Sequence, residues 1–344
     1  MKAYCSLPFD RMKIDSDGSY QSCCHQTTYY GNILTDNTTI EEAFKGKTLV
    51  SVKNSVMGSK MHPGCNNTKC PLYFTSLERN VDVALSKYPK QIELSLPSSW
   101  CNIGGLNPTP DTACIMCPRS SESYITNFVN LPDNTNLLLD IIKPAIPHLE
   151  TFTLLGIAEP FYKGRLFEVF DRIEFKKYKD TILFWTFCNG SLFGEKYQDM
   201  FVDEYTSKSC IGFSIDAATP ETYIKIRRLD YYATIQKNLE RYFNKVNNLG
   251  YKRDWSFTAY NINMLNLHEM EDMLRFGNNI GSNKVQYTLT YVSDPGMKID
   301  RRLLCNDKNW NLFWEKQQRI EQLAAELNQK VEFYVPFHGG YLKE

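Results

Sequence analysis

The sequence predicts an α/β protein built on a parallel sheet. From about residue 90 onward, short segments rich in β-branched, aromatic and apolar residues alternate with longer segments of helical spacing. A strand that is followed by a helix and then by a neighbouring strand of the same sheet usually runs parallel to it. This number of strands can form either a partial barrel or an open doubly wound sheet, and the periodicity of the sequence favours neither.

The alternating part of the chain supplies the main elements of this prediction. We expect strands at residues 91–96, 151–155, 181–186, 210–215, 255–260 and 285–291. We expect long helices at residues 137–146, 165–176, 232–249, 267–280 and 310–327. Thr219-Pro220 is expected to open a further helix, because threonine caps helices and proline suits their first turn.

The first 75 residues differ from the rest, with short strand-like pieces between turn signals at residues 15–18 and 31–32. Thr38 or Thr39 is expected to cap a short helix that begins at Ile40. The region is too small and too rich in loops for a core of its own, so a bound metal would help it fold. We expect a small domain over residues 1–75, a helical connector over 76–89 and the α/β part over 90–344.

The composition argues against some classes of partner. The 344 residues carry 39 basic and 39 acidic side chains, so no basic excess favours nucleic acid or an anionic membrane. The N-terminus lacks the apolar core of a signal peptide, and no apolar run approaches the roughly 20 residues that span a bilayer. We expect a soluble cytoplasmic protein, in which the 11 cysteines are better metal ligands than disulfide partners.

Three cysteines follow the first strand of the alternating part. Cys101 follows this strand, and Cys114 and Cys117 follow a loop with two glycines and two prolines. Active sites of parallel α/β folds lie at this end of the strands. Three thiolates can hold a four-iron cluster and leave one iron free for a substrate or cofactor. The alternative is a zinc site in which His62 or another residue completes four ligands.

Further motifs follow the next predicted strands. Residues 154–160 read Leu-Leu-Gly-Ile-Ala-Glu-Pro, and residues 186–190 read Thr-Phe-Cys-Asn-Gly. Residues 214–216 read Ser-Ile-Asp, and Thr-Pro-Glu-Thr-Tyr at 219–223 precedes Ile226-Arg227. In this order the motifs resemble those of the radical S-adenosylmethionine superfamily, over roughly residues 90–295.

The chain departs from the family pattern in three places. Twelve residues separate Cys101 from Cys114, where the family usually has three. Met116 stands where the family tends to have an aromatic residue, and Ile157-Ala158 replace its second glycine region. The first departure puts the cysteine motif in doubt when it is taken alone.

The resemblance implies a partial (β/α)6 TIM-like barrel and a four-iron cluster on Cys101, Cys114 and Cys117. It implies an enzyme that reductively cleaves S-adenosylmethionine to a 5′-deoxyadenosyl radical, which then abstracts hydrogen from a substrate. An electron donor of the flavodoxin or ferredoxin type would supply the reducing electron. The resemblance assigns cofactor contacts to Met116, Gly156, Glu159, Asn189, Ser214, Asp216 and Arg227.

Individual roles for some of these residues also follow from the resemblance. Glu159 would accept from the amino group of the cofactor. Ser214 and Asp216, which alternate to one side of a strand, could reach the ribose hydroxyls. Arg227 would meet the cofactor carboxylate or a substrate anion.

The N-terminal cysteines carry a second resemblance. Cys5, Cys23, Cys65 and Cys70, with Gly18 at a hairpin turn, resemble the auxiliary-cluster region called SPASM or its shorter Twitch form. In familiar enzymes this region follows the barrel, whereas here it precedes it. The four thiolates would close a second four-iron cluster, with zinc as the rival occupant. Cys24 could replace Cys23 as a ligand, although neighbouring side chains on a strand face opposite ways.

The substrate is less defined than the chemistry. Auxiliary-cluster relatives modify peptides, by crosslinking or epimerisation, or oxidise or epimerise sugars and alcohols, and we favour a peptide. Such an enzyme is an oxidoreductase or a maturase, and Cys305 could be a thiol hydrogen donor to the substrate radical. The alternative from another class is a zinc-binding scaffold without catalysis.

Overall fold

A single curved sheet forms the centre of the computed structural model. The structure describes residues 2–3, 5–23, 26, 28–58, 62–65, 79–80, 86–103, 111–120, 132–249, 255–289 and 309–334. The sheet has 10 strands in the order β12-β11-β10-β9-β8-β7-β6-β2-β3-β4. Its strands are β2 (Arg11–Ile14), β3 (Ser19–Gln21), β4 (Gly31–Asn32), β6 (Gln91–Leu96), β7 (Thr151–Gly156), β8 (Leu183–Cys188), β9 (Ser209–Ser214), β10 (Phe257–Ile262), β11 (Lys284–Leu289) and β12 (Lys330–Tyr334).

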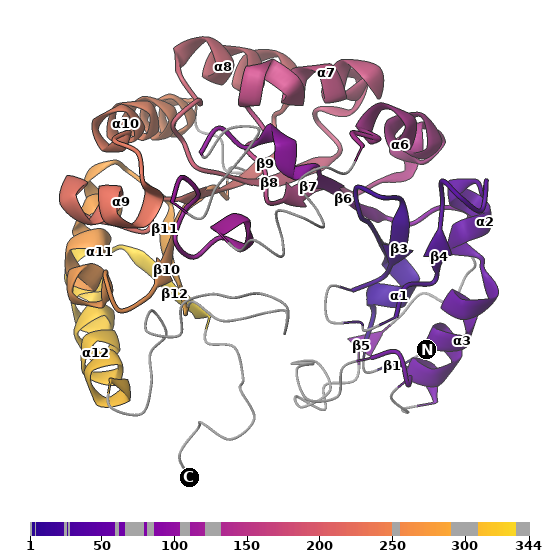
Figure 1. Ribbon diagram of the computed structural model, residues 1–344, viewed down its shortest axis with the longest axis horizontal. Coiled ribbons are helices and arrows are strands. Elements are labelled where there is room, and N and C mark those ends of the chain that lie inside the picture. Colours follow the sequence, from indigo (N-terminus) through magenta and orange to yellow (C-terminus); the bar gives the residue numbers. More distant parts are fainter. Residues whose placement is uncertain are drawn as a thin grey trace.

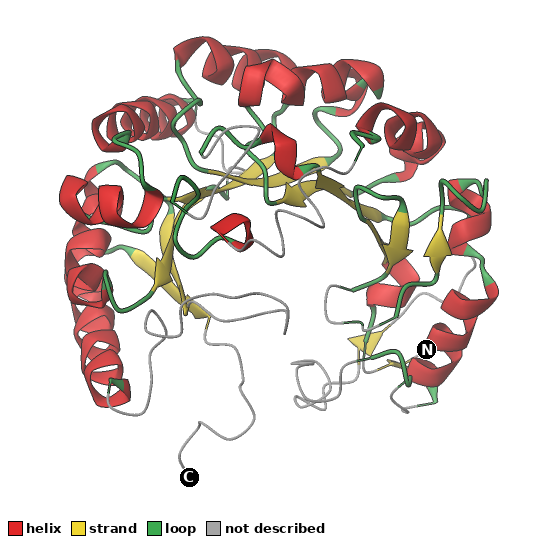
Figure 2. Cartoon of the chain, in the orientation of Figure 1, coloured by secondary structure: helices red, strands yellow, loops and turns green. Residues whose placement is uncertain are grey.

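Helices cover the outer side of this sheet. Strands β6 to β12 pair in parallel, and helices that connect them line the convex side of the curve, as Figures 1 and 2 show. The helices are α1 (Leu7–Asp10), α2 (Ile40–Phe44), α3 (Lys47–Met57), α6 (Thr135–Ile142), α7 (Arg165–Arg172), α8 (Glu195–Asp199), α9 (Pro220–Arg227), α10 (Tyr232–Asn248), α11 (Met270–Asn279) and α12 (Trp310–Leu327). Short 3-10 helices lie at Ser98–Trp100, Pro118–Ser120, Lys143–His148, Tyr162–Gly164, Phe175–Tyr178 and Leu267–Glu269, and a π-helix at Met200–Tyr205. The predicted partial barrel of α/β type is confirmed.

The strands form where the sequence alternates between the two faces of the sheet. In β8, Phe184 and Thr186 are buried, and Phe184 packs against Phe170 of α7 with ring centroids 4.9 Å apart. Trp185 and Phe187 point to the other face, where they pack on a smaller apolar cluster of β9 and β10. Alternate side chains therefore bind the helix layer on one side and line the inner curve on the other.

The N-terminal residues extend the same sheet. Strand β2 pairs in parallel with β6, from Arg11 opposite Gln91 to Ile14 opposite Leu94. Met12 and Ile14 of β2 belong to the main hydrophobic core together with residues of the barrel. Sheet and core thus run without a break past the expected domain boundary, and the division into domains stays a prediction.

Local signals in this region form as expected. Gly18 turns the chain between β2 and β3 with φ of 89°, and a Cβ there would lie 2.6 Å from Leu34 Cγ. The Thr39 hydroxyl accepts a hydrogen bond from the Glu42 N–H, and the Glu42 side chain bonds back to the Thr39 N–H. The structure therefore confirms Thr39 as the cap of α2.

The expected helical connector over 76–89 is wrong at its six described residues, because 86–89 are not helical and 79–80 form a strand. Arg79–Asn80 form strand β5, which pairs antiparallel with β1 (Lys2–Ala3) and makes a separate two-stranded sheet. Residues 76–78 and 81–85 lie outside the described residues. No helix within the described ranges is long and apolar enough to cross a membrane.

Candidate active site at the carboxyl edge of the sheet

The residues singled out by the sequence gather at one edge of the sheet. Cys101 follows β6, Glu159 follows β7, Asn189 follows β8 and Asp216 follows β9. Because these strands are parallel, their carboxyl ends share one edge. Arg227, the last residue of α9, returns to this edge and pairs with Asp216.

The three central cysteines lie close to one another. Cys114 is buried, and the chain turns back after it through a hydrogen bond from the Cys117 N–H to the Cys114 carbonyl at 3.0 Å. Burial raises the pKa of Cys101 and raises that of Cys117 to about 12, and the charge of Cys114 raises both further. The three sulfurs thus lie within electrostatic reach of one another, in surroundings that disfavour bare thiolates.

The donor set fits an iron–sulfur cluster. Among the described residues, no three Cys, His, Asp or Glu side chains converge on a position for one metal ion. In a four-iron cluster each thiolate binds a different iron, so three sulfurs need not converge on one point. Cys101, Cys114 and Cys117 would supply three soft ligands, and two buried arginines beside them would offset the negative charge of such a cluster.

One of these arginines, Arg119, was not anticipated from the sequence. Only 1% of its side chain is exposed, and its Nη1 donates to the Ile103 carbonyl at 2.9 Å. The same carbonyl accepts from the Cys101 thiol at 3.5 Å. The charge of Arg119 lowers the pKa of both Cys101 and Cys117, against the stronger effect of burial. A basic residue directly after Cys117-Pro118 was the available signal.

Helix α9 holds the second half of the cysteine loop. The Ile115 N–H donates to the Ile226 carbonyl at 3.0 Å. Arg227 Nη1 lies 3.6 Å from Cys114 Sγ, and its Nη2 donates to the Ser214 carbonyl at 2.8 Å. The loop after β6 is therefore fastened to elements that follow β9, and Figure 1 shows it, in purple, inside the curve of the sheet.

Asp216 occupies the centre of this arrangement. Its buried carboxylate pairs with Arg227 and accepts from the Asn261 N–H at 2.6 Å. Burial raises its pKa, while Arg227 and these hydrogen bonds lower it. Strand β9 ends at Ser214 and Asp216 has φ of 61°, so strand alternation does not place this carboxylate. Left-handed backbone at a non-glycine residue is costly and is common at functional sites.

Glu159 lies fully buried between the ends of three strands. It accepts hydrogen bonds from the Asn189 N–H at 2.7 Å and the Phe161 N–H at 3.2 Å. Burial raises its pKa to about 7, and these two N–H groups and Arg227 oppose the rise. The Asn189 side chain donates to Asn102 Oδ1 at 2.9 Å, so the ends of β6 and β8 are linked directly. No motif in the sequence pointed to Asn102.

Gly156 and Met116 have defined places beside this network. Gly156 ends β7 with φ of 121°, and a Cβ there would lie 2.7 Å from the Leu96 carbonyl oxygen. Only glycine fits that approach to β6. Met116 Sδ lies 3.9 Å from Asn263 Nδ2, which follows β10. Both residues therefore lie at the same edge as Cys101.

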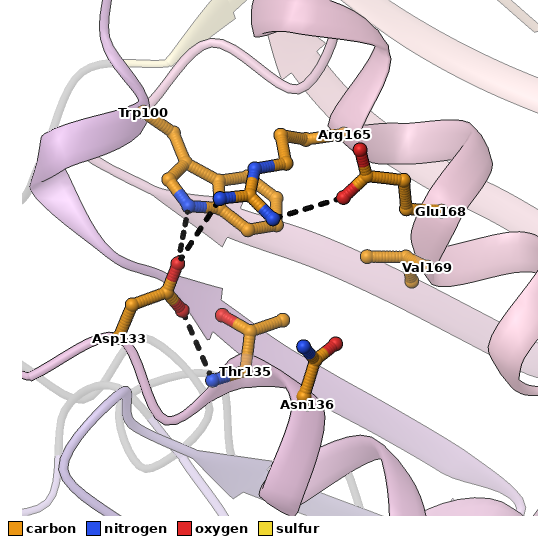
Figure 3. Close-up of a pocket in the computed structure, with 7 residues that line it drawn as sticks. All are labelled: Trp100, Asp133, Thr135, Asn136, Arg165, Glu168 and Val169. Carbon is orange, nitrogen blue, oxygen red and sulfur yellow. Dashed lines mark hydrogen bonds and ion pairs between the residues drawn. The ribbon is translucent and has the colours of Figure 1, made fainter.

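The start of the cysteine loop lines a small pocket, which Figure 3 shows with the contacts between its lining residues. Trp100 immediately precedes Cys101 and is 4% exposed. Its indole N–H donates to Asp133 at 2.9 Å, and the Arg165 guanidinium lies 5.4 Å from its ring centroid. Asp133 also accepts from the Thr135 N–H at 3.1 Å, at the start of α6. These contacts hold the chain just before Cys101 against the helix layer.

The N-terminal cysteines have different surroundings. Cys5 is buried in a small apolar cluster with Phe9, Val52 and Val56. Cys23 and Cys65 both contact the backbone of Gln26, Cys23 through a 3.2 Å hydrogen bond and Cys65 through an isolated β-bridge. Cys70, Cys24 and Cys305 lie outside the described residues, so the expected ligand set and the hydrogen donor stay predictions.

Comparison with known proteins supports the fold. No protein-family model and no curated protein matches the chain. Native anSMEcpe with bound AdoMet aligns with a TM-score of 0.51 and 16% identity, over 71% of this chain and 64% of that chain. SuiB of Streptococcus suis bound to S-adenosylmethionine aligns with a TM-score of 0.50 and 11% identity, over 89% of this chain and 62% of that chain.

A third solved structure is more distant. Coproporphyrinogen III oxidase (HemN) from Escherichia coli, described as a radical SAM enzyme, aligns with a TM-score of 0.42 and 10% identity, over 68% of this chain and 52% of that chain. The chain spans 64%, 62% and 52% of the length of these three structures. It thus shares the fold of two proteins solved with S-adenosylmethionine bound.

Proposed function

We propose that the protein is a radical S-adenosylmethionine enzyme. The observation that carries the proposal is the meeting of Cys101, Cys114 and Cys117 with Glu159 and Arg227 at the carboxyl edge of the sheet. The fold shared with two proteins that bind S-adenosylmethionine supports it. Sulfur ligands for a cluster and a carboxylate for an ammonium group are the two parts that this chemistry requires.

Each group at the edge has a role in this proposal. Cys101, Cys114 and Cys117 would hold a four-iron cluster, which when reduced cleaves S-adenosylmethionine to a 5′-deoxyadenosyl radical that takes hydrogen from the substrate. Glu159 would accept from the cofactor's ammonium group, and the two N–H groups that hold it leave lone pairs on its oxygens for that contact.

The other residues predicted to bind the cofactor are supported by fewer observed contacts. Met116, Gly156, Asn189 and Ser214 lie at the same edge and can line the cofactor site. Asp216 already pairs with Arg227 and Asn261, so we assign it first to the orientation of Arg227. A bound cofactor in this network would also exclude water from the reacting groups.

The substrate proposed is a peptide, modified by crosslinking or epimerisation. The resemblance of Cys5, Cys23, Cys65 and Cys70 to an auxiliary-cluster region allows a peptide or a sugar or alcohol, and of these we favour the peptide. These four cysteines would bind a second four-iron cluster, and a flavodoxin or ferredoxin would donate the electron. Cys305 is retained as a candidate hydrogen donor.

Anaerobic purification tests the proposal directly. We expect a brown protein with about eight irons per chain, as two four-iron clusters require. Addition of dithionite or reduced flavodoxin with S-adenosylmethionine should form 5′-deoxyadenosine, measured by chromatography. Stoichiometric zinc without cleavage of the cofactor would instead identify a zinc-binding scaffold.

A further inference from the structure

Helix α9 presents two buried hydrogen-bond donors on one side. Tyr223 and Arg227 are four residues apart, so they occupy the same face of the helix. The side chain of Tyr223 is fully buried and that of Arg227 is nearly so. The Thr219 cap and Glu269, which accepts from the Thr219 and Thr222 hydroxyls, fix the start of this helix.

The face that carries these donors meets the cysteine loop. Arg227 Nη1 lies 3.6 Å from Cys114 Sγ, and the Ile115 N–H bonds to the Ile226 carbonyl at 3.0 Å. Helix and loop therefore form one packed unit around Cys114. Asp216 holds the guanidinium of Arg227 from the opposite side, and the Asn261 N–H holds Asp216 at 2.6 Å.

Part of the donor capacity of this face is unused. The Tyr223 hydroxyl and Arg227 Nε are both buried, and neither has a hydrogen-bond partner within the described residues. Buried polar groups in folded proteins nearly always have partners, so an unpaired one needs an explanation. Tyr223 lies one helical turn before Arg227, whose Nη1 is 3.6 Å from Cys114 Sγ, so the Tyr223 side chain and the sulfur site share one side of α9.

The geometry points to Tyr223 and Arg227 as positioning residues that donate to the sulfur atoms around Cys114 and thereby set the reduction potential of the bound cluster. The inference rests on the proposed function, and it gives Arg227 a role beyond contact with a carboxylate. Reduction adds negative charge to the cluster, and hydrogen bonds to its sulfurs stabilise that charge. Hydrogen bonds to the cluster sulfurs would also give the Tyr223 hydroxyl and Arg227 Nε the partners that they otherwise lack.

The test compares Tyr223→Phe with a matched tyrosine variant in the anaerobically purified holoenzyme. The control is Tyr242→Phe, which removes a buried hydroxyl that contacts Ser256 Oγ at 3.1 Å in the core. The cluster is followed by electron paramagnetic resonance during a redox titration, using the signal that changes when S-adenosylmethionine is added. We expect Tyr223→Phe to disfavour one-electron reduction about tenfold, a shift of about 59 mV to lower potential, and the control to leave it unchanged.

A second readout tests the contact itself. Electron–nuclear double resonance of the reduced cluster in H2O and D2O should detect exchangeable protons near it, and Tyr223→Phe should remove one coupling. Arg227→Lys, which keeps the charge and loses the planar fork, should also lower the potential. If the Tyr223→Phe variant does not retain iron, the reduction potential and the proton coupling are both measured on the Arg227→Lys variant.

The outcomes separate this inference from the function on which it rests. An unchanged potential and an unchanged proton coupling in both variants would overturn the inference while the cluster and cofactor cleavage remain. A wild-type protein without iron would overturn the proposed function and the inference with it. A lowered potential in both variants, with the control unaffected, establishes α9 as the element that tunes the cluster.

Discussion

The two groups of cysteines differ in what surrounds them. The central group lies among buried charges, with Arg119, Arg227 and Glu159 near the sulfurs. In the N-terminal group, Cys5 lies in an apolar cluster with Phe9, Val52 and Val56. A site that binds a charged cofactor needs fixed charges of its own, whereas a closed cluster needs only its ligands and a dry pocket. The contrast favours the central group as the site of the proposed reaction.

The largest effect is expected from the central cysteines. Replacement of Cys101, Cys114 and Cys117 by Ala should abolish cleavage of S-adenosylmethionine and leave about four irons per chain. Iron analysis and assay of 5′-deoxyadenosine measure both. Cleavage that survives in the triple variant would refute the ligand assignment.

The converse experiment alters the N-terminal group. Cys5→Ala with Cys65→Ala should remove about four irons, because a closed cluster loses half of its four ligands. Binding of S-adenosylmethionine should persist, since these residues lie apart from Glu159 and Arg227. Equilibrium binding under anaerobic conditions measures it. Loss of cofactor binding together with the iron would show that the two sites are not separate.

A smaller effect is expected at Glu159. Burial raises its pKa to about 7, so below that pH the side chain becomes neutral and cannot pair with an ammonium group. Affinity for S-adenosylmethionine should fall as pH falls through about 7, approaching tenfold per pH unit. Glu159→Gln should bind about tenfold more weakly at pH 8 and lose this dependence. A wild-type affinity that does not change between pH 6 and 8 contradicts the assigned role.

The smallest effect concerns the packing that holds the central loop. Trp100→Phe removes the hydrogen bond to Asp133 and should lower the free energy of unfolding by about 1 kcal/mol. Trp185→Phe is the control, because Trp185 packs edge-to-face on Phe187, with ring centroids 4.9 Å apart. Urea titration compares them. Equal losses of unfolding free energy in the two variants would show that the hydrogen bond to Asp133 has no particular role in holding the loop.

Local patterns predicted the elements of the fold well. The six expected strands match β6 to β11, and the expected helices match α6, α7, α10, α11 and α12 within a few residues. The first of these helices ends earlier than expected, at Ile142, because Pro144 and Pro147 lack the N–H that would continue it. The threonine signals at Thr39 and Thr219 are both confirmed as helix caps.

Contacts between residues far apart along the chain could not be predicted from the sequence. The pairing of β2 with β6 joins residues about 80 positions apart, and no local pattern specifies such a partner. Strand β12 is short and carries charged residues at Lys330 and Glu332, so it lacks a clear apolar signal. Arg119 and Asn102 join the site through hydrogen bonds that form only in the folded state. The site residues themselves remain assignments by resemblance that await the experiments above.

The pairing of β2 with β6 has a consequence for synthesis. Residues of β2, β3 and α2 leave the ribosome well before β6, yet the edge of β2 is completed only when Gln91–Leu96 arrives. During that interval Met12 and Ile14, which end in the main core, lack the partners that bury them. The N-terminal hairpin therefore offers an open strand edge on which β6 can pair as soon as it has been synthesised.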